Sequence, residues 1–201
     1  MKQSLMEQLK EQRWDDHRYY HQSRVNQFLH LISAMSFLGS YVLLFINPPL
    51  AALIAWLVAM TLRQSGHFFF EPKGYDNLNK ASHEFKESIK VGYNLRRKQI
   101  LIGVWAALPL LLIYKPDLFG LLEPHQSIEQ LILNVGWIWL WLGVAAVLAR
   151  MLWLFATQNL ATGVIWVFKI LTDPLHDVAL YRRSPMQLMR GEWFETELAR
   201  H

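Results

Sequence analysis

Apolar segments long enough to cross a membrane divide this chain of 201 residues. The first, Phe28–Ile46, can span a bilayer as one helix, which takes about 20 residues. The Asn-Pro-Pro link at 47–49 ends it, because proline cannot continue a helix. The second segment, Leu50–Leu62, is short for a span, so it either is re-entrant or crosses with residues 64–70 extending the helix. Because the link is so short, we expect the two segments to form a tight antiparallel hairpin.

Two further apolar segments follow after a polar stretch. The third, Ile100–Tyr114, contains Pro109 and is expected to kink there. The fourth covers residues 131–149 and is long enough to span. Beyond it, residues 151–155 and 160–171 stay apolar with polar interruptions. This pattern is more typical of an interfacial amphipathic helix carrying tryptophan than of a fifth span.

Positive charge is distributed unevenly over the connecting segments. If all four segments cross, every one of the 20 Lys and Arg residues except Lys115 falls on the same side of the membrane. The positive-inside rule places that side, with both termini, in the cytoplasm. The split also favours the short second segment as a true crossing, since a re-entrant segment would move the C-terminal charges outside.

We therefore expect one all-α polytopic membrane domain over residues 1–201, with four transmembrane helices and an interfacial amphipathic helix. Residues 1–27 form a cytoplasmic segment, and 28–155 hold the transmembrane helices with a cytoplasmic loop at 63–99. Residues 156–201 form the interfacial and cytoplasmic C-terminal segment. The expected location is the bacterial inner membrane, or the endoplasmic reticulum membrane if the chain is eukaryotic.

Composition removes several classes of function. Charged residues make up 18% of the chain, against about 25% in soluble domains, and 53% are hydrophobic. There is no cysteine, which excludes disulfides, thiolate nucleophiles and cysteine-held iron–sulfur clusters. The sequence has no nucleotide-binding loop, no nucleophile elbow and no HExxH motif. Basic residues 96–98 abut the third segment and are interpreted as an anchor to anionic lipid, not to nucleic acid. Any metal must be held by His, Asp or Glu.

Two of the eight histidines lie at membrane depth. His30 falls just inside the first apolar segment and His67 at the cytoplasmic end of the second. Ionisable groups at such depth are costly and usually face the interior of a bundle, where they act as ligands or as hydrogen-bonded interior residues. His21 and His30 are nine residues apart, on opposite faces of a straight helix. If Ser23 caps a new helix, the chain breaks there and His21 can fold back over His30; otherwise the helix is continuous.

Two other clusters of residues contain candidate functional side chains, and the first of them lies around His67. Gly66 permits close helix contact next to His67, and Glu71 lies four residues later on the same helix face. Glu71 could be a ligand, an acceptor that orients a histidine ring, or a solvated carboxylate.

The last cluster is near the C-terminus. Asp173 as N-cap and Pro174 at the first helical position predict a helix start. This would place His176 and Asp177 in the first turn of a cytoplasmic helix.

Together these residues form three motifs in order, YHx4Nx3H, GHxxFE and a late His-Asp pair, at Tyr20, His21, Asn26, His30, Gly66, His67, Phe70, Glu71, His176 and Asp177. The chain resembles the 2-hydroxy fatty acid dioxygenase family, small polytopic membrane proteins of yeast and bacteria. The likeness covers mainly residues 17–77. It implies Fe(II)-dependent α-oxidation, in which a 2-hydroxy fatty acid reacts with O2, loses its carboxyl carbon and becomes one carbon shorter.

On this basis we expect a metal site at the cytoplasmic ends of the first two segments, holding Fe(II). The expected partners are the 2-hydroxy fatty acid, O2 and membrane lipid, and no nucleic acid. Two alternatives remain open, a haem-binding membrane redox protein and a non-enzymatic membrane scaffold or lipid-binding protein. The expected metal ligands are His21, His30, His67 and His176, with Asn26, Glu71 and Asp177 orienting them, supplying a fifth ligand or assisting catalysis.

Overall fold

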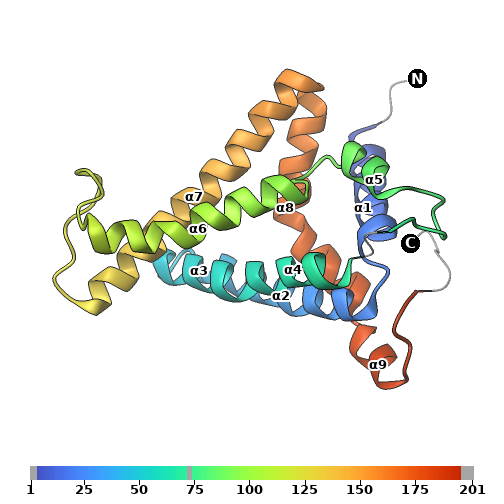
Figure 1. The fold of residues 1–201 in the computed structure, drawn as a ribbon, viewed down its shortest axis with the longest axis horizontal. Helices are drawn as coiled ribbons and strands as arrows, with labels where there is room; N and C mark the ends of the chain where they lie inside the picture. The colour runs from blue at the N-terminus through green and yellow to red at the C-terminus, as the bar shows by residue number, and fades with distance from the viewer. Residues whose placement is uncertain (1–3, 72–73, 196–201) are drawn as a thin grey trace.

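The computed structural model describes residues 4–71 and 74–195. Within these ranges the chain folds as helices with no β-strand, which confirms the all-α prediction (Figure 1). The charge count above also includes Lys2, Lys73 and Arg200, which lie outside the described residues.

The N-terminal part forms two helices with a break between them. Helix α1 (Leu5–Tyr20) begins at a capping box, in which the Ser4 hydroxyl accepts from the backbone N–H of Glu7 and the Glu7 carboxylate accepts from that of Ser4. Helix α2 (Arg24–Leu43) begins after Ser23, whose hydroxyl accepts from the Asn26 N–H. The predicted chain break at Ser23 is confirmed.

The second apolar segment is one uninterrupted helical run. It comprises α3 (Pro48–Ile54), η1 (Ala55–Met60), α4 (Thr61–Ser65) and η2 (Gly66–Phe70), of which η1 and η2 are π-helical. Asn47 caps its start by accepting from the Leu50 N–H. The run lies antiparallel to α2, as the short link predicts (Figure 1).

The segment 63–99, expected as a cytoplasmic loop, is partly helical, and the alternative in which residues 64–70 extend the second helix is the one found. The second helix continues to Phe70 because its polar residues find partners: Arg63, for example, donates to the Asp177 carboxylate at 3.0 Å. Within the same stretch lie α5 (His83–Ile89) and the first turn of α6 (Leu95–Tyr114), so the connecting segment is shorter than expected.

Two helices in the described part of the chain are long and apolar enough to cross a membrane, α6 and α7 (Ile128–Thr157). They are consistent with a membrane location. Pro109 lies inside α6. Arg150, the expected end of the fourth segment, is instead accommodated within α7, because its guanidinium donates to the Val91 carbonyl.

The C-terminal part folds back on α7. Helix α8 (Leu160–Tyr181) begins at Asn159 and returns beside α7, and the short α9 (Ser184–Met189) follows it (Figure 1). The apolar stretch predicted as one interfacial helix is thus divided between the end of α7 and α8.

The helix start predicted at Asp173 and Pro174 is wrong, since both residues lie inside α8. Proline removes one backbone donor but does not end this helix. Asp173 pairs with Lys169 one turn earlier, at 2.5 Å, and with Arg13 of α1, so it serves as an ion-pair partner and not as a cap.

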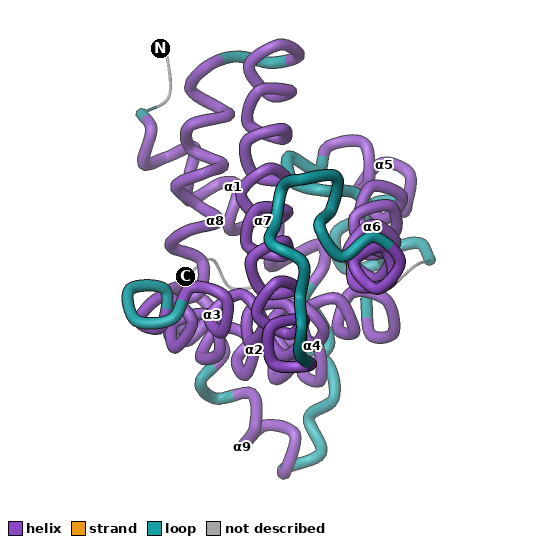
Figure 2. The backbone as a smooth tube through the Cα atoms, turned by 90° about the vertical axis from the view of Figure 1, so that its left-hand side faces the viewer, coloured by secondary structure: helices purple, strands orange, loops and turns teal. Residues whose placement is uncertain are grey.

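An aromatic core holds the helices together at the end far from α1. The indole of Trp56 donates to the Trp139 carbonyl at 2.8 Å, and that of Trp139 donates to the Trp105 carbonyl at 3.0 Å. These contacts join η1, α6 and α7. Figure 2 shows the α7–α8 hairpin standing above the layer of α2, α3 and α4, with α6 to one side. Buried polar side chains lie at the other end of the layer, near α1 and α8.

Candidate metal centre

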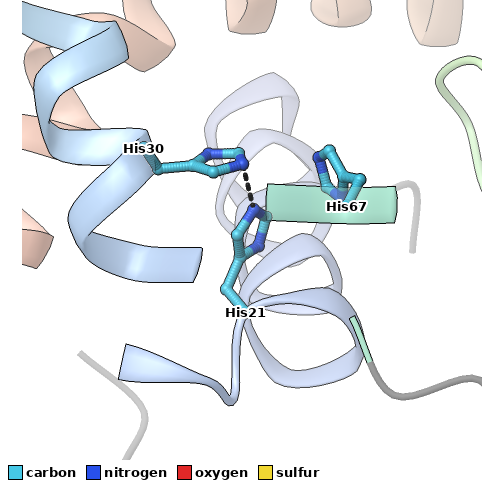
Figure 3. A group of neighbouring side chains, drawn as sticks. All are labelled: His21, His30 and His67. Atoms are coloured by element: carbon cyan, nitrogen blue, oxygen red, sulfur yellow. Dashed lines mark hydrogen bonds between the residues drawn. The ribbon is translucent and has the colours of Figure 1, made fainter. Parts of the chain in front are cut away.

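Three histidines converge where α1, α2 and η2 meet. His21, His30 and His67 are all buried, and one ring nitrogen of each lies within 4.8 Å of those of the other two (Figure 3). The Nε2 atoms of His21 and His30 are 3.2 Å apart. The ring centroid of His67 lies 5.2 Å from that of His21 and 5.0 Å from that of His30. This convergence is what the break at Ser23 makes possible.

The position of His21 is set by hydrogen bonds to the linker between α1 and α2. Its Nδ1 donates to the Asp16 carbonyl at 2.8 Å. The Asn26 amide donates to the Tyr20 carbonyl and the Gln27 amide donates to the His21 carbonyl, both at 2.7 Å. Two neighbouring side chains of α2 therefore hold the chain at the end of α1, Asn26 through the Tyr20 carbonyl next to His21.

His67 is oriented by the residue one turn after it. Its Nδ1 donates to the Glu71 carboxylate at 2.7 Å, as the i, i+4 spacing predicts. Gly66 lies against α2, where an added Cβ would sit 2.0 Å from Asn26 Oδ1 and 3.5 Å from the His30 ring. The absence of a side chain at this position lets η2 approach α2 closely, and it confirms the prediction made for Gly66.

These hydrogen bonds determine which nitrogens can bind an ion. Because the Nδ1 atoms of His21 and His67 carry protons, their Nε2 lone pairs are available. Two nitrogens bound to one ion at about 2.1 Å lie roughly 3.0–3.4 Å apart at angles between square and tetrahedral. The 3.2 Å between His21 and His30 falls in that range. The donor set therefore fits a divalent transition metal held by neutral imidazoles.

Burial keeps the His21 ring neutral. Removal from water, together with the neighbouring His30 ring, holds the pKa of His21 well below its ordinary value. A neutral imidazole is the form that ligates metal. The site is therefore preset for ligation at neutral pH.

Asp177 approaches the third histidine from α8. Its Oδ2 lies 3.8 Å from His30 Nδ1 and accepts from Arg63 at 3.0 Å. Nδ1 of His30 has no hydrogen-bond partner among the described residues. Asp177 is thus placed to accept a hydrogen bond from the Nδ1–H of His30 when Nε2 serves as a ligand.

His176 is not brought into this cluster. Successive residues of a helix point about 100° apart, so only one of the neighbours His176 and Asp177 can face the three histidines. Asp177 does, whereas the half-buried His176 lines a separate hollow together with His17 and Arg182. Of the four expected ligands, the structure gathers three.

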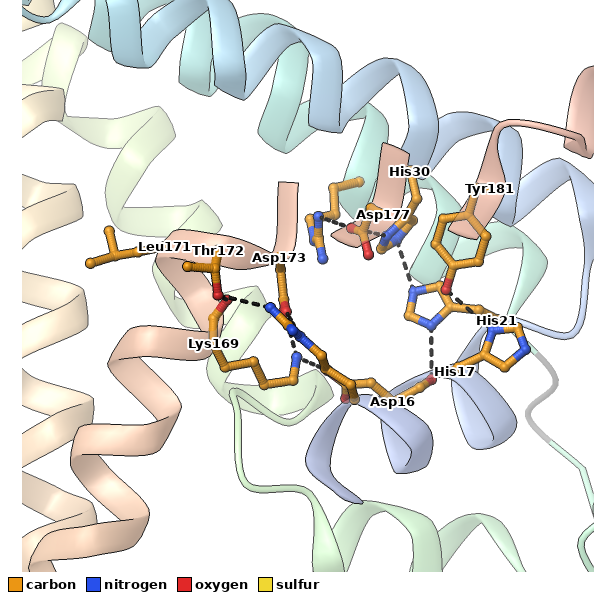
Figure 4. A network of polar contacts seen from close by, with 12 residues as sticks. Asp16, His17, His21, His30, Lys169, Leu171, Thr172, Asp173, Asp177 and Tyr181 are labelled. Carbon is orange, nitrogen blue, oxygen red and sulfur yellow. Dashed lines mark hydrogen bonds and ion pairs between the residues drawn. The ribbon is translucent and has the colours of Figure 1, made fainter. Parts of the chain in front are cut away.

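A network of buried and partly buried charges lies beside the site. Lys169 of α8 pairs with Asp16 and Asp173, and Arg13 donates to Asp173 and Thr172 (Figure 4). These contacts hold α1 against α8. They also fix the position of Asp16, whose backbone carbonyl orients His21. The sequence analysis missed this role, although the i, i+4 spacing of Lys169 and Asp173 within an apolar stretch was its signal.

A cavity of about 180 Å³ opens beside the cluster. His21 and His67 form part of its wall, so at least two candidate ligands face a space that a small molecule can enter. Its remaining wall is partly apolar, from Met60, Leu101 and Trp166, and partly charged. The chain matches no protein-family model, no curated protein and no solved structure.

Proposed function

We propose that this protein is a membrane-bound, Fe(II)-dependent dioxygenase that shortens 2-hydroxy fatty acids by one carbon. The observation that carries the proposal is the convergence of three buried histidines from separate helices on one point beside a cavity. The family resemblance supplies the reaction and the substrate class. The cavity, with both charged and apolar walls, is compatible with an amphipathic acid.

The proposed reaction converts a 2-hydroxy acid and O2 into the acid one carbon shorter, CO2 and water. The C1–C2 bond breaks, the substrate gives up four electrons and O2 accepts them. When bound, Fe(II) supplies the redox chemistry and positions for the hydroxyl and carboxylate oxygens of the substrate. The chain itself binds the ion through His21, His30 and His67, and orients two of these rings through Glu71 and the Asp16 carbonyl.

We also propose that the chain crosses the membrane four times, through α2, the helical run of 48–70, α6 and α7. The continuous helix through Phe70 supplies the length that the second segment needs. The charge asymmetry then places the histidine cluster at the cytoplasmic face. There the acyl tail of a substrate can remain in lipid while its head group reaches the cavity.

A haem ligated by both His21 and His30 is disfavoured by the site geometry. Haem ligands bind iron from opposite faces of a planar macrocycle. The rings of His21 and His30 contact each other at 4.2 Å between centroids, which leaves no space for such a plane between them. A Soret band in the purified protein would reverse this judgement.

Elemental analysis of anaerobically purified protein tests the metal site. We expect about one iron per chain, and a strong loss in each of the variants His21→Ala, His30→Ala and His67→Ala, because three ligands share one ion. The matched controls His83→Ala and His125→Ala lie outside the cluster and should retain wild-type metal. Equal loss from His125→Ala would show general misfolding, and no bound transition metal in the wild type would favour the scaffold alternative.

Activity is tested on the iron-loaded protein in a lipid environment with O2. We expect 2-hydroxyhexadecanoate to yield pentadecanoate and hexadecanoate to remain unchanged, because it lacks the second oxygen for chelation. Lactate, which lacks the apolar tail, should be a poor substrate. Removal of iron by a chelator should abolish the reaction. Absence of chain shortening under these conditions would overturn the proposed activity.

A further inference from the structure

Four cationic and three anionic side chains form the charged wall of the cavity beside His21 and His67. Three of the four cations have carboxylate partners within 4.0 Å, which neutralise them in the fold. The pairs are Lys169 with Asp16 and Asp173, Arg63 with Asp177, and Lys90 with Glu87.

The fourth cation is Lys98, in the first turn of α6. Among the residues that the structure describes, its ammonium group has no hydrogen bond and no ion pair within 4.0 Å. Lys90 is a second cation of the same cavity wall and repels it. Glu71 attracts it, but that carboxylate already accepts from His67. A half-buried cation in this setting is stabilised when an anion enters the cavity.

The apolar part of the same cavity indicates what the anion carries. Met60, Leu101 and Trp166 belong to η1, α6 and α8, and Ile89 of α5 adds to them, so the apolar wall is formed by side chains of several helices. The volume of about 180 Å³ is below the roughly 300–1,000 Å³ of pockets that enclose whole drug-sized ligands. The cavity therefore suits a head group and the first carbons of a chain, with the remaining chain outside it.

We propose that Lys98 anchors the carboxylate of an amphipathic acid in this cavity, next to the histidine cluster. As a positioning residue it places the carbon beside the carboxylate near His21 and His67. The assignment of this acid as the substrate rests on the proposed function, whereas the anion subsite itself rests on the unpaired ammonium and the cavity.

Binding to the full-length protein tests the subsite without activity. The probes are 2-hydroxydecanoate and its uncharged counterpart 1,2-decanediol, measured by calorimetry on the protein as purified and after metal removal. We expect Lys98→Gln to weaken binding of the acid about 10- to 100-fold, the range that a charge-assisted hydrogen bond contributes. Binding of the diol should change less than about threefold. The matched control Arg96→Gln, on the exposed side of the same helix turn, should bind both like the wild type.

A second measurement uses the wild type, in case Lys98→Gln does not fold. We expect 2-hydroxydecanoate, but not the diol, to protect Lys98 from amine acetylation read by mass spectrometry, while the exposed Lys80 reacts equally in all samples. Unchanged acid binding in folded Lys98→Gln, or absence of protection, overturns the proposal. If the acid binds through Lys98 and no chain shortening occurs, the subsite stands and the dioxygenase fails. If shortening occurs with the same KM in Lys98→Gln, the reverse holds.

Discussion

Gly66→Ala should damage both the stability of the fold and the metal site. The new methyl group would sit 2.0 Å from Asn26 Oδ1, whereas an unstrained carbon–oxygen contact is about 3.3–3.6 Å. Either η2 must move away from α2 by more than 1 Å, roughly the shortfall of that contact, or the Asn26 amide must turn and release the Tyr20 carbonyl. In both cases His21, His30 and His67 lose their mutual spacing.

The magnitude follows from three contributions. Overpacking costs about 1–3 kcal/mol, and loss of a buried hydrogen bond about 1–2 kcal/mol. The higher helix propensity of alanine returns up to about 1 kcal/mol. The net destabilisation is about 1–4 kcal/mol, which for a chain of this size lowers Tm by roughly 2–16 °C.

Thermal unfolding in detergent, combined with metal analysis, is the assay. Gly39→Ala is the matched control, because a Cβ at that position of α2 meets nothing within 4 Å. In an Asn26→Ala background, which removes the clashing amide, Gly66→Ala should cost less than about 1 kcal/mol. A Gly66→Ala protein with wild-type Tm and wild-type metal would refute the close contact between η2 and α2.

The remaining predictions concern topology, ligand orientation and pH. Reporter fusions after Glu123 should report an extracytoplasmic position and fusions after Lys80 a cytoplasmic one; a cytoplasmic result at Glu123 would overturn the four-span arrangement. Glu71→Ala should lower metal affinity about 10- to 100-fold in chelator competition, since it orients His67, and unchanged affinity would contradict that role. Burial alone would raise the pKa of Asp16, but the ammonium of Lys169 outweighs it and holds this pKa below its usual range. Burial would lower the pKa of Lys169, but its carboxylate partners raise it above its usual range. The stability from this pair should therefore be complete between about pH 4 and pH 10, lost as pH falls through the lowered pKa of Asp16 and as it rises through the raised pKa of Lys169. Unfolding of Asp16→Asn should show a weaker acid dependence, and an identical acid limb would contradict it.

Local sequence signals were sufficient to indicate the parts of the site that contain His21, His30 and His67. A serine cap, a glycine and an i, i+4 pair each act over one or two helix turns, so Ser23, Gly66 and Glu71 could be interpreted without knowledge of the tertiary fold. Among the alternatives that these signals leave open are a contact between His21 and His30 and orientation of His67 by Glu71 of its own helix, and the structure has both contacts.

The contribution of α8 could not be obtained in the same way. Which of His176 and Asp177 faces the cluster depends on the rotation of α8 about its axis, and that rotation is set by long-range pairs such as Lys169 with Asp16. The Asp-Pro pair at 173–174 carries a typical signal for a helix start, but tertiary ion pairs outweigh it. The unpaired state of Lys98 likewise emerges only when all the cavity walls are assembled.

The π-helical segment η1 has a consequence for how much this chain tolerates insertions and deletions. A π-turn accommodates an additional residue relative to an α-helix, and each residue turns an α-helix by about 100°. Deleting one residue between Ala55 and Met60 would therefore convert the wide turn into an ordinary α-turn and leave the residues after it on nearly the same helix face. Deleting Leu62 in the α-helical stretch α4 instead would rotate everything after it by about 100°. Gly66 would then leave the α2 surface and His67 would point away from the other two histidines, although no residue of the site itself had been altered. The spacing along this helix is therefore as much a determinant of the metal centre as the identity of its ligands.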